Sequence, residues 1–405
     1  MKNNFSGQTV LNSITYLVGN ADILGNMSSI PAKKPFDDGI IEFMNDVSRT
    51  LMGMREAKMY SDIVTLAFWI RKASVMRLKE RFYEQDRYIC LGRGMVFHIA
   101  PSNVPVNYAY SLFTGLLTGN ANIVRIPSKD FPQVEIINRA INEALKNHEE
   151  IRPYICLARY DRSREINDLL SLTADMRIIW GGDATIGEIR KSPLKPRAGE
   201  ITFANRYSLA VIDSDRYLAI EDKGKIAEDF YNDTYLTDQN ACTSPRIVVW
   251  KGNKKEEAKK EFWNNLHEVV KKKYGFQPIQ AVNKLVSSYL LGAVQDGVKI
   301  ECCEDNLIVR VKVSEIREDI MDFMDNSGYF FEYDCENILE LRKLCDDRQC
   351  QTVAYIGEGE MLMPLIHSGV RGIDRIVPVG KTMDFDLIWD GYNLFERLTR
   401  IVKID

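Results

Sequence analysis

Short apolar runs alternate with longer amphipathic segments along most of the chain. Between residues 94 and 183 the pattern predicts four strands, each followed by a segment whose apolar residues have helical spacing. The predicted strands are 94–100, 121–127, 154–160 and 176–182, and the helices are 104–119, 131–148, 164–174 and one that begins near Asp183. This alternation, with short connections that end in Gly or Pro, is typical of βαβ units and predicts a doubly wound α/β sheet.

Two further regions flank this pattern. Residues 1–90 are mostly helical in pattern, with apolar residues at helical spacing over 39–54 and 62–82. After residue 213 a second α/β pattern predicts strands at 244–250, 306–313, 328–334 and 351–357, and helices at 254–275 and 336–346. We therefore expect a helical segment and a Rossmann-like cofactor domain over 1–212, and a catalytic α/β domain over 213–372. Residues 373–405 are expected to return to the cofactor domain or to an interface.

Composition narrows the class of protein. The 405 residues are 45% hydrophobic, which is enough for two cores, and the net charge of −4 argues against a nucleic-acid partner. No run approaches the roughly 20 apolar residues of a membrane span, and the N-terminus lacks a signal-peptide pattern. The eight cysteines have neither disulfide-scaffold nor zinc-site spacing. We expect free thiols, no metal and a cytoplasmic protein.

Two short motifs suggest a site at the ends of predicted strands. The dinucleotide fingerprint GxGxxG is absent, but Gly182 and Gly187 flank a helix start directly after a strand, where backbone N–H groups can face a pyrophosphate. Such a turn is also common without any ligand. Asn103 follows another predicted strand, where either Ser102 or Asn103 is a plain helix cap or the Asn103 amide stabilises an oxyanion.

Cys242 stands directly before a predicted buried strand, in "QNACTS". A lone cysteine is usually a small buried hydrophobe. It is a nucleophile only where its surroundings stabilise the thiolate, so the residues alone leave both interpretations open. His98 lies inside an apolar strand run, which favours a hydrogen-bonded core histidine over a site residue.

Four motifs together resemble those of the aldehyde dehydrogenase superfamily. "PSNVP", "GLLTGNANIVRIPS", "WGGDATIG" and the lone cysteine in "QNACTS" occur in that superfamily's order. The wording "HIAPSNVP", "GNANIVRIPSKD" and "GIDRIVPVGKTMDFDLIWDGYNLFERLTRIV" is similar to one branch, the bioluminescence-type acyl-CoA reductases (the LuxC family). The resemblance runs from about residue 90 to the C-terminus. It implies an aldehyde dehydrogenase-like fold, with a Rossmann-like cofactor domain and a second, catalytic α/β domain.

The resemblance also implies roles for particular residues. Cys242 becomes the nucleophile, and the Asn103 side chain with the Cys242 backbone N–H becomes the oxyanion site. The implied cofactor is NADPH, with NADH as the alternative. The residues implied to contact it are Ala100, Pro101, Ser102, Arg125, Pro127, Ser128, Lys129, Gly181, Gly182 and Gly187.

Two departures from the superfamily pattern bear on the chemistry. Aldehyde-oxidising members carry a glutamate that activates water, and our alignment puts Phe203 at that position, with Glu200 nearby but out of register. This departure favours acyl-thioester reduction over oxidation to a free acid. Lys129 lies near the position where NAD-using members carry an acid, and Arg125 with Lys129 suits a 2′-phosphate. Two solvated cations after a strand is the alternative interpretation.

We therefore expect an NAD(P)H-dependent reductase that converts an acyl-CoA or acyl-protein thioester into the aldehyde through an S-acyl cysteine. The alternatives are an acyl-phosphate reductase of the same superfamily, a cofactor-free cysteine acyltransferase or thioesterase, and a non-catalytic subunit. Expected partners are the acyl-CoA or acyl-carrier substrate, an acyl-activating enzyme such as an acyl-protein synthetase, and further copies of the chain. For the motif at Trp389, packing on the cofactor domain is the expected role.

Overall fold

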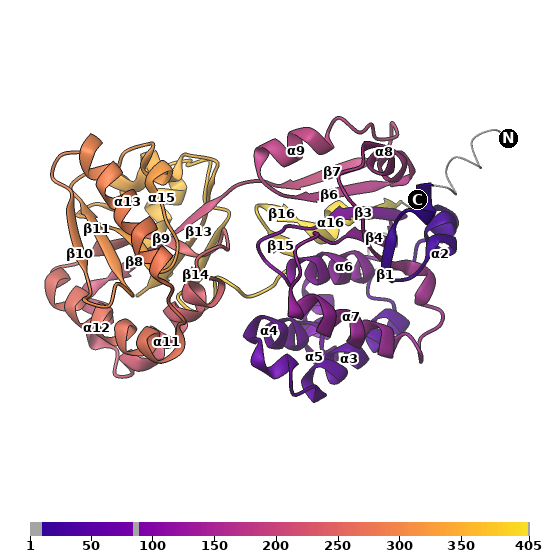
Figure 1. The fold of residues 1–405 in the computed structure, drawn as a ribbon, viewed down its shortest axis with the longest axis horizontal. Coiled ribbons are helices and arrows are strands. Elements are labelled where there is room, and N and C mark those ends of the chain that lie inside the picture. Colours follow the sequence, from indigo (N-terminus) through magenta and orange to yellow (C-terminus); the bar gives the residue numbers. More distant parts are fainter. Residues whose placement is uncertain (1–9, 84–88, 404–405) are drawn as a thin grey trace. The chain divides into compact units, whose positions relative to one another are not determined.

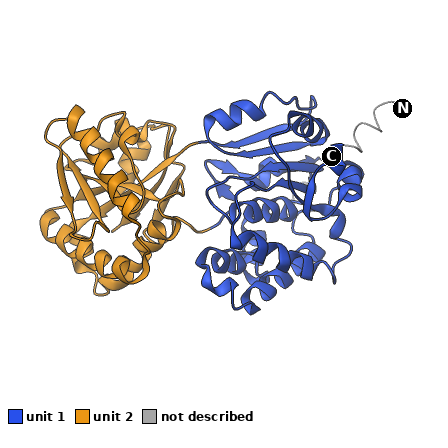
Figure 2. Ribbon diagram, viewed as in Figure 1, with its two compact units in different colours: residues 1–204, 385–405 blue, residues 205–384 orange. Residues whose placement is uncertain are grey.

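The computed structural model describes residues 10–83 and 89–403, which form two compact units. Unit 1 comprises Met1–Ala204 and Phe385–Asp405, and unit 2 comprises Asn205–Asp384 (Figure 2). Unit 1 is therefore built from two separate stretches of the chain, whereas unit 2 is one continuous stretch between them. No helix of the described residues is both long and apolar enough to cross a membrane.

Unit 1 is built on a six-stranded sheet with the order β1-β5-β4-β3-β6-β7 (Figure 1). The strands are β1 (Thr15–Val18), β3 (Met95–Ile99), β4 (Ala121–Arg125), β5 (Ile155–Arg159), β6 (Met176–Trp180) and β7 (Gly199–Phe203). β1 is antiparallel to β5, and every other neighbouring pair is parallel. The four strands predicted between residues 94 and 182 are confirmed as β3, β4, β5 and β6. The edge strands β1 and β7 were not predicted.

Helices cover both faces of this sheet. Because crossovers between parallel strands are right-handed, α6 and α7 lie on one face, and α8 and α9 on the other. On the first face, α3 packs against α7 and α4. The bounds of these helices are α2 (Ala21–Asn26), α3 (Asp38–Gly53), α4 (Ser61–Ile70), α5 (Lys72–Phe82), α6 (Asn107–Leu117), α7 (Pro132–Ala144), α8 (Arg164–Thr173) and α9 (Asp183–Ile189).

The helical spacing over residues 62–82 belongs to two helices rather than one. Arg71, between α4 and α5, is extended, with φ −66° and ψ 146°. The backbone N–H of Lys72, at the start of α5, donates to Oδ1 of the buried Asn45 on α3, at 3.0 Å. The Arg71 side chain donates from Nε to Ser74 Oγ, at 3.1 Å. These contacts hold the break at a place where neither glycine nor proline marks it in the sequence.

Unit 2 has a seven-stranded sheet with the order β10-β11-β12-β9-β8-β13-β14. Its strands are β8 (Tyr207–Asp213), β9 (Pro245–Lys251), β10 (Lys299–Cys302), β11 (Val309–Val313), β12 (Tyr329–Asp334), β13 (Cys350–Ile356) and β14 (Arg375–Pro378). Only the edge strand β10 is antiparallel to its neighbour. The strands predicted in this region correspond to β9, β11, β12 and β13. Cys302 lies on the exposed edge strand β10.

Both faces of this second sheet are buried. Along β8, Leu209 and Val211 enter one core cluster, while Ala210 and Ile212 enter the other. Helices α11 (Lys223–Asp233) and α12 (Lys255–Lys273) cover the second cluster, and α13 (Pro278–Val294) covers the first. The predicted helix over 336–346 is a 3-10 turn, Ile338–Leu341, followed by the short α14 (Arg342–Cys345). The central strands β8 and β9 therefore read as largely continuous apolar runs. Strand β11, with the sequence VRVKV, alternates between buried and partly exposed residues.

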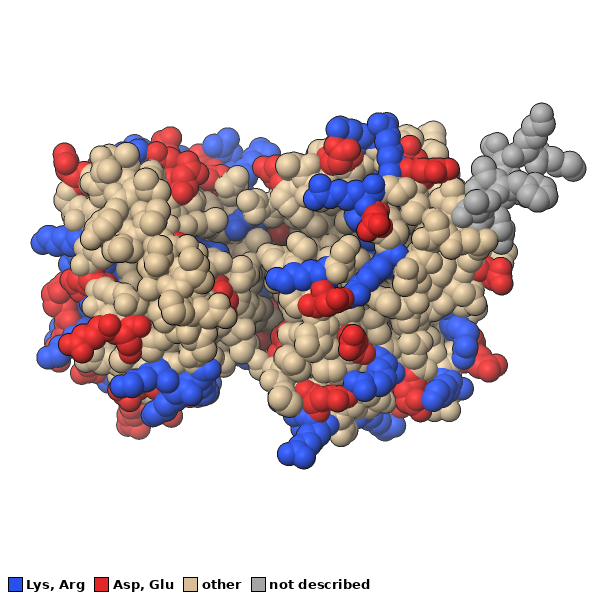
Figure 3. All heavy atoms as spheres, viewed as in Figure 1, with Lys and Arg blue, Asp and Glu red and all other residues tan. Residues whose placement is uncertain are grey.

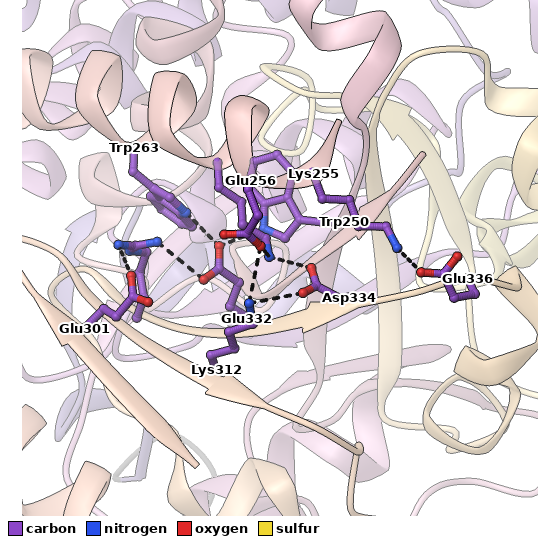
Figure 4. Close-up of polar contacts among 11 residues, drawn as sticks. Trp250, Lys255, Glu256, Trp263, Glu301, Lys312, Glu332, Asp334 and Glu336 are labelled. Carbon is purple, nitrogen blue, oxygen red and sulfur yellow. Dashed lines mark hydrogen bonds and ion pairs between the residues drawn. The ribbon is translucent and has the colours of Figure 1, made fainter. Parts of the chain in front are cut away.

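A buried polar network joins α12 to the sheet of unit 2 (Figure 4). The Glu332 side chain, 1% exposed, accepts hydrogen bonds from Nε1 of Trp250 and of Trp263, each at 2.8 Å. Arg310 lies 3.4 Å from the same carboxylate. Lys312 reaches Asp334, at 3.2 Å, on the neighbouring strand. The buried carboxylate is therefore compensated by two indole N–H groups and one cation, as a buried charge requires.

The C-terminal segment belongs to unit 1. Its hairpin consists of β15 (Ile388–Trp389) and β16 (Tyr392–Asn393), joined by Asp390 and Gly391, which both have positive φ angles of 48° and 72°. Two such residues favour the tight turn of a β-hairpin. Trp389 packs on Tyr110 of α6, with ring centroids 5.4 Å apart, which is the packing role expected of this motif. Further on, β17 (Thr399–Val402) pairs with β2 (Ile89–Gly92).

The unit boundaries differ from those expected from the sequence. The expected limits after residues 212 and 372 both lie inside unit 2. The first limit cuts β8 near its end, although β8 is a central strand of the unit 2 sheet. The second separates β13 from its parallel neighbour β14. The chain therefore changes unit just before β8 and again after the β14 loop, at residues 204–205 and 384–385.

Candidate active site

The sheet of unit 1 has a topological switch point. From β3 the chain adds β4 and β5 on one side and then β6 and β7 on the other, so the direction of winding reverses between β3 and β6. Open parallel sheets bind ligands at the carboxyl ends of the strands at such a reversal. The loop after β3 contains Ala100, Pro101, Ser102 and Asn103, and the loop after β6 contains Gly181 and Gly182. The predicted residues of unit 1 therefore meet at the edge where this fold binds ligands.

The loop after β3 presents two polar side chains outward. Ala100 is buried and donates its N–H to the carbonyl oxygen of Arg125, at 3.0 Å, which extends the β3–β4 ladder. Ser102 and Asn103 are exposed, and Val104 behind them is buried. The cap residue of α6 is Val106, without a side-chain cap. The N-cap position of α6 is therefore Val106, rather than Ser102 or Asn103.

The turn after β6 leaves open space around two glycines. The N–H of Gly181 donates to the Phe203 carbonyl oxygen, at 3.1 Å, and a Cβ added to Gly181 would lie 3.1 Å from the Thr185 side chain. By contrast, a Cβ at Gly182 or Gly187 would meet none of the described atoms within 4 Å. The packing of unit 1 itself therefore does not require glycine at 182 or 187. Their missing side chains leave room for a ligand to approach the backbone.

Cations gather at the carboxyl ends of β4 and β5. The guanidinium of Arg125 lies 4.8 Å from the centroid of the Tyr160 ring, and its Nε is buried with no hydrogen-bond partner within the described part of the chain. Arg159, which the sequence analysis did not single out, lies at the end of β5 and pairs with Asp130 at 2.8 Å. Lys129 is exposed in the loop between these residues. The other predicted residues of this loop are Pro127, partly exposed, and Ser128, exposed.

Glu200 and Phe203 occupy opposite ends of β7. Glu200 accepts hydrogen bonds from Nε of Arg177, at 2.8 Å, and from Nε of Arg190, at 2.7 Å. Phe203 is buried at the carboxyl end, where its ring stacks on that of Trp180 with centroids 3.7 Å apart. Glu200 is thus held by two guanidinium groups, away from the edge to which β7 directs its carboxyl end. An apolar ring stands at the position that our alignment matched to the water-activating glutamate.

His98 is a core residue of β3, as predicted. It is fully buried, with Nδ1 2.7 Å from Ser111 Oγ and Nε2 3.0 Å from Asn122 Oδ1. Asn122 donates from Nδ2 to the Asn120 carbonyl oxygen, so its Oδ1 is the acceptor and His98 Nε2 carries the proton. Burial lowers the pKa of His98 to about 4, against the weaker effect of the Asn122 hydrogen bond. The ring is therefore neutral at physiological pH and takes no part in the site.

Cys242 lies in unit 2, on the loop that leads into β9. It is partly exposed, between the buried residues Ala241 and Thr243. Its carbonyl oxygen accepts a hydrogen bond from Ser208 Oγ, at 2.7 Å, which fixes the backbone of the loop to β8. Cys242 is therefore partly exposed, and its backbone is hydrogen-bonded to β8. A partly exposed cysteine held by its backbone is the arrangement that a reactive thiol needs.

The loop before Cys242 is held in an unusual backbone conformation. Asp238 and Gln239 both have φ 52°, and such left-handed residues persist only where the surroundings fix them. The buried Gln239 side chain does this: its Oε1 accepts from the N–H of Gly328, at 2.8 Å, and of Tyr329, at 3.1 Å, while its Nε2 donates to the Tyr329 carbonyl oxygen, at 3.1 Å. One amide thus ties the loop to the start of β12.

Arg246 provides a buried positive charge close to this loop. Its Nη1 donates to the Asp325 carbonyl oxygen and to Asn326 Oδ1, both at 2.6 Å, and its Nη2 donates to the Gln239 carbonyl oxygen. Burial lowers the pKa of Arg246 to about 10, and the charge of Cys242 is the largest of the effects that oppose this. The guanidinium therefore stays charged at neutral pH. Because the coupling is mutual, it stabilises the Cys242 thiolate.

All eight cysteines are free thiols. Cys303 also belongs to one group of side chains that could hold a metal ion, with His267 and Asp305, whose ligand atoms lie within 4.8 Å of one another. His267 Nε2 and Asp305 Oδ2 are already 2.7 Å apart, at hydrogen-bond distance. The spacing rules applied to the sequence did not point to this group, because its residues come from α12 and from the turn between β10 and β11.

The predicted site residues divide between the two units. Asn103 and the predicted cofactor residues lie in unit 1, on or beside the loops that follow β3, β4 and β6, with Arg125 at the end of β4 and Gly187 inside α9. Cys242 lies in unit 2. The sequence analysis missed Gln239, Arg246 and Arg159. Gln239 and Arg246 both lie within four residues of Cys242 in the sequence. A polar residue before the cysteine and a cation on the strand after it could therefore have indicated them. Nothing local distinguishes Arg159 from a solvated arginine.

Comparison with known protein families assigns the chain. Residues 70–401 match the family model described as "Acyl-CoA reductase (LuxC)". The chain belongs to this family. It is similar to the long-chain acyl-protein thioester reductase of Vibrio harveyi, at 24% identity over 325 residues, which cover 77% of this chain and 64% of the relative. The chain thus spans less than two thirds of that relative's length.

Solved structures establish the fold. An NAD-dependent benzaldehyde dehydrogenase from Corynebacterium glutamicum matches with a TM-score of 0.63 at 13% identity, over 99% of this chain and 89% of the other. An apo betaine aldehyde dehydrogenase from Staphylococcus aureus matches with a TM-score of 0.64 at 13% identity, over 98% and 86%. The aldehyde dehydrogenase-like α/β fold expected from the sequence motifs is confirmed.

Proposed function

We propose that this acyl-CoA reductase family member reduces a long-chain acyl thioester to the aldehyde, with NADPH as reductant and an S-acyl intermediate on Cys242. Family membership supports thioester reduction, and the similarity to the long-chain acyl-protein thioester reductase of Vibrio harveyi supports a long acyl chain. The observation that carries the proposal is the structure of the Cys242 loop. The Gln239 side chain holds this loop in place, and the positive charge of the buried Arg246 favours the thiolate form of Cys242.

Cys242 performs the acyl transfer. Its thiolate attacks the thioester carbonyl carbon, a new carbon–sulfur bond forms, and the developing oxyanion receives hydrogen bonds from the Asn103 side chain and the Cys242 backbone N–H. A donor of this kind typically stabilises the transition state by about 3 kcal/mol. Collapse of the oxyanion breaks the original carbon–sulfur bond and releases the CoA or carrier thiolate. The product of this step is the S-acyl enzyme.

The loops at the switch point of unit 1 are suited to a nicotinamide dinucleotide. Gly182 and Gly187 leave the backbone accessible. The buried Arg125 Nε has no hydrogen-bond partner among residues 10–83 and 89–403, and a phosphate oxygen would supply one. Arg125, Lys129 and Arg159 would hold the 2′-phosphate that distinguishes NADPH from NADH. The bound cofactor supplies the hydride that reduces the acyl carbon. The aldehyde leaves as the carbon–sulfur bond to Cys242 breaks and the thiol regains its proton.

Phe203 disfavours hydrolysis of the S-acyl enzyme. A hydrolytic route needs a base that activates water next to the acyl carbon. The Phe203 ring has no titratable group, and the nearby Glu200 is occupied by Arg177 and Arg190. The acyl group therefore persists on Cys242 until it is reduced or returned to a thiol. This feature favours the reductase over the thioesterase alternative.

The proposed setting of the reaction follows from its substrate. An acyl-activating or acyl-transferring enzyme would supply the thioester. We place this partnership in the cytoplasm. The acyl donor is acyl-CoA or an acylated carrier protein.

The test is to incubate the protein with NADPH and acyl-CoAs of increasing chain length while following nicotinamide absorbance and trapping the aldehyde. We expect one aldehyde per NADPH consumed, with Cys242→Ala inactive but unchanged in cofactor affinity. Without NADPH, mass spectrometry is expected to find the acyl group on the peptide that contains Cys242. Free acid as the main product, or acylation of Cys242→Ala at the wild-type rate, would contradict the proposal.

A further inference from the structure

Helix α13 of unit 2 carries its large apolar side chains on its outer face. Its buried residues are Lys284, Ser288 and Leu291. The outer face, which we call the α13 face, consists of seven large apolar side chains that are 49–63% exposed: Ile279, Val282, Leu285, Val286, Tyr289, Leu290 and Val294. This is the reverse of the usual arrangement, in which a surface helix turns its apolar side chains towards the core.

The helix has no charge on this face. Lys284 is its only charged residue, and its Nζ points inward, where it donates to the carbonyl oxygens of Ser327, at 2.8 Å, and Asn306. Figure 3 shows a patch without charged side chains over α13 in unit 2. A partner recognised by charge would find no counter-ion here. The complementary surface must itself be apolar and uncharged.

The area is that of a specific interface. Seven half-exposed large side chains offer roughly 700 Å² of apolar surface, and stable interfaces bury about 800 Å² on each partner. Apolar patches on monomeric proteins rarely exceed a few hundred Å². An apolar face of this size on a single helix therefore indicates a protein interface.

The order of residues along the face fits a second copy of the same helix. Ile279, Val282, Val286, Tyr289 and Ala293 are separated alternately by three and four residues, which is the spacing of a helix-pair seam. Ile279 and Ala293 lie equally far from Val286 along the sequence, and Val282 and Tyr289 lie four and three residues from it. A row that reads alike from both ends is what a two-fold interface requires, because each residue then meets its counterpart on an antiparallel copy.

We propose that two copies of the chain associate through their α13 faces, as an antiparallel helix pair whose two-fold axis passes near Val286. Each Val286 then lies beside the Val286 of the other copy, while Ile279 lies near Ala293. The exposed polar residue at the start of the helix, Gln277, lies at the rim. This interface is separate from the proposed chemistry of Cys242.

The test measures molecular mass by light scattering at tens of micromolar protein. We expect the wild type at twice the 46.5 kDa of one chain, or at an even multiple. Val286→Glu and Val286→Lys each place like charges together on the two-fold axis, so each is expected to have half the wild-type mass. Mixed in equal amounts, they place Glu against Lys, and the wild-type mass is expected to return. That recovery also shows that both variants are folded.

A matched control is Leu172→Glu in unit 1, which changes a side chain of 49% exposure outside the α13 face. This variant is expected to keep the wild-type mass. A monomeric wild type, an unchanged mass in Val286→Glu, or a mixture of the two variants that stays at half mass would each overturn the proposal. Thioester reduction by the dimeric wild type is measured separately, so its absence would affect only the proposed function.

Discussion

The ring of Phe203 lies on the ring of Trp180, with centroids 3.7 Å apart and 19° between the planes. The two residues are direct partners on the parallel strands β7 and β6, at the end of each strand. Tyr392 of the C-terminal hairpin meets Phe203 edge-on, at 5.8 Å. Hydrocarbon therefore fills the position where a hydrolytic relative would carry its base.

Phe203→Glu is expected to divert the product from aldehyde towards free acid. The new carboxylate stands where aldehyde-oxidising proteins are expected to carry their water-activating glutamate. Burying it against Trp180 is also expected to destabilise unit 1 by about 2–4 kcal/mol. Product analysis by mass spectrometry and urea unfolding measure the two effects. Phe203→Leu is the control: it loses the stacking and about 1–3 kcal/mol, but gives no acid. Equal acid yields from both variants would show that the carboxylate does not act on water.

Arg246→Met is expected to raise the pKa of the Cys242 thiol, because it removes the buried positive charge. The rate at which iodoacetamide alkylates Cys242, followed by peptide mass spectrometry across a pH series, reports this pKa. Arg246→Lys keeps the charge and is expected to shift the alkylation profile less. Identical profiles for wild type and Arg246→Met would mean that the guanidinium only supports the loop.

Glu332→Ala is expected to lower the free energy of unfolding of unit 2 by about 3–5 kcal/mol, since it leaves two buried indole N–H groups without their acceptor and removes one of the two carboxylates that pair with Arg310. Glu332→Gln keeps one acceptor oxygen and is expected to cost less. The control is Glu336→Gln, which alters the exposed ion pair with Lys255 and should change stability by less than about 1 kcal/mol. Urea denaturation compares the three. Equal effects at 332 and 336 would contradict a buried, energetically coupled carboxylate.

His98 is expected to make unit 1 sensitive to acid. Its pKa is lowered to about 4 in the folded state, from the ordinary value of 6.5, so the folded state disfavours the protonated ring. The stability that this provides is complete above pH 6.5 and is lost as the pH falls towards 4, by about 3 kcal/mol. Unfolding free energies measured across this pH range give the slope. His98→Gln is expected to be less stable at pH 7 but to show a shallower decline. An unchanged slope would mean that other groups cause the acid sensitivity.

Arg125→Gln is expected to raise the KM for NADPH by at least about 10-fold while leaving that for NADH nearly unchanged, because a charge-assisted contact to the 2′-phosphate is lost. Initial rates with each coenzyme measure the effect. The control is Arg164→Gln, which removes an exposed arginine on α8. Parallel losses for both coenzymes would indicate that Arg125 only supports the β4 loop.

The sequence predicted the βαβ succession of unit 1 because each buried strand and each amphipathic helix has its own local period. It did not predict the sheet order, since the reversal between β3 and β6 depends on contacts between distant residues. The motif order led to Asn103, Gly182 and Cys242 as candidates. The supporting residues Gln239 and Arg246 escaped notice because their role depends on backbone atoms of β12 and its preceding loop, which lie far along the chain.

Other differences arise where local pattern and tertiary structure conflict. The apolar period over residues 62–82 continues through Arg71, although Asn45 on another helix stabilises a break there. Helix α13 was not predicted at all. Most of its large apolar residues face outward and its lysine faces inward. The positions of the apolar residues therefore do not indicate which face of the helix packs on the core of unit 2.

The pairing of β2 with β17 has a consequence for biosynthesis. Strand β2, residues 89–92, can pair with β17 only after residues 399–402 have been synthesised. In the same way, Tyr110 can pack on Phe385 and Trp389 only after those residues have been synthesised. Every residue of unit 2 leaves the ribosome before those last segments do. Unit 2 can therefore complete its core during translation, whereas unit 1 lacks the partners of β2 and of Tyr110 until residues 385–402 have been synthesised.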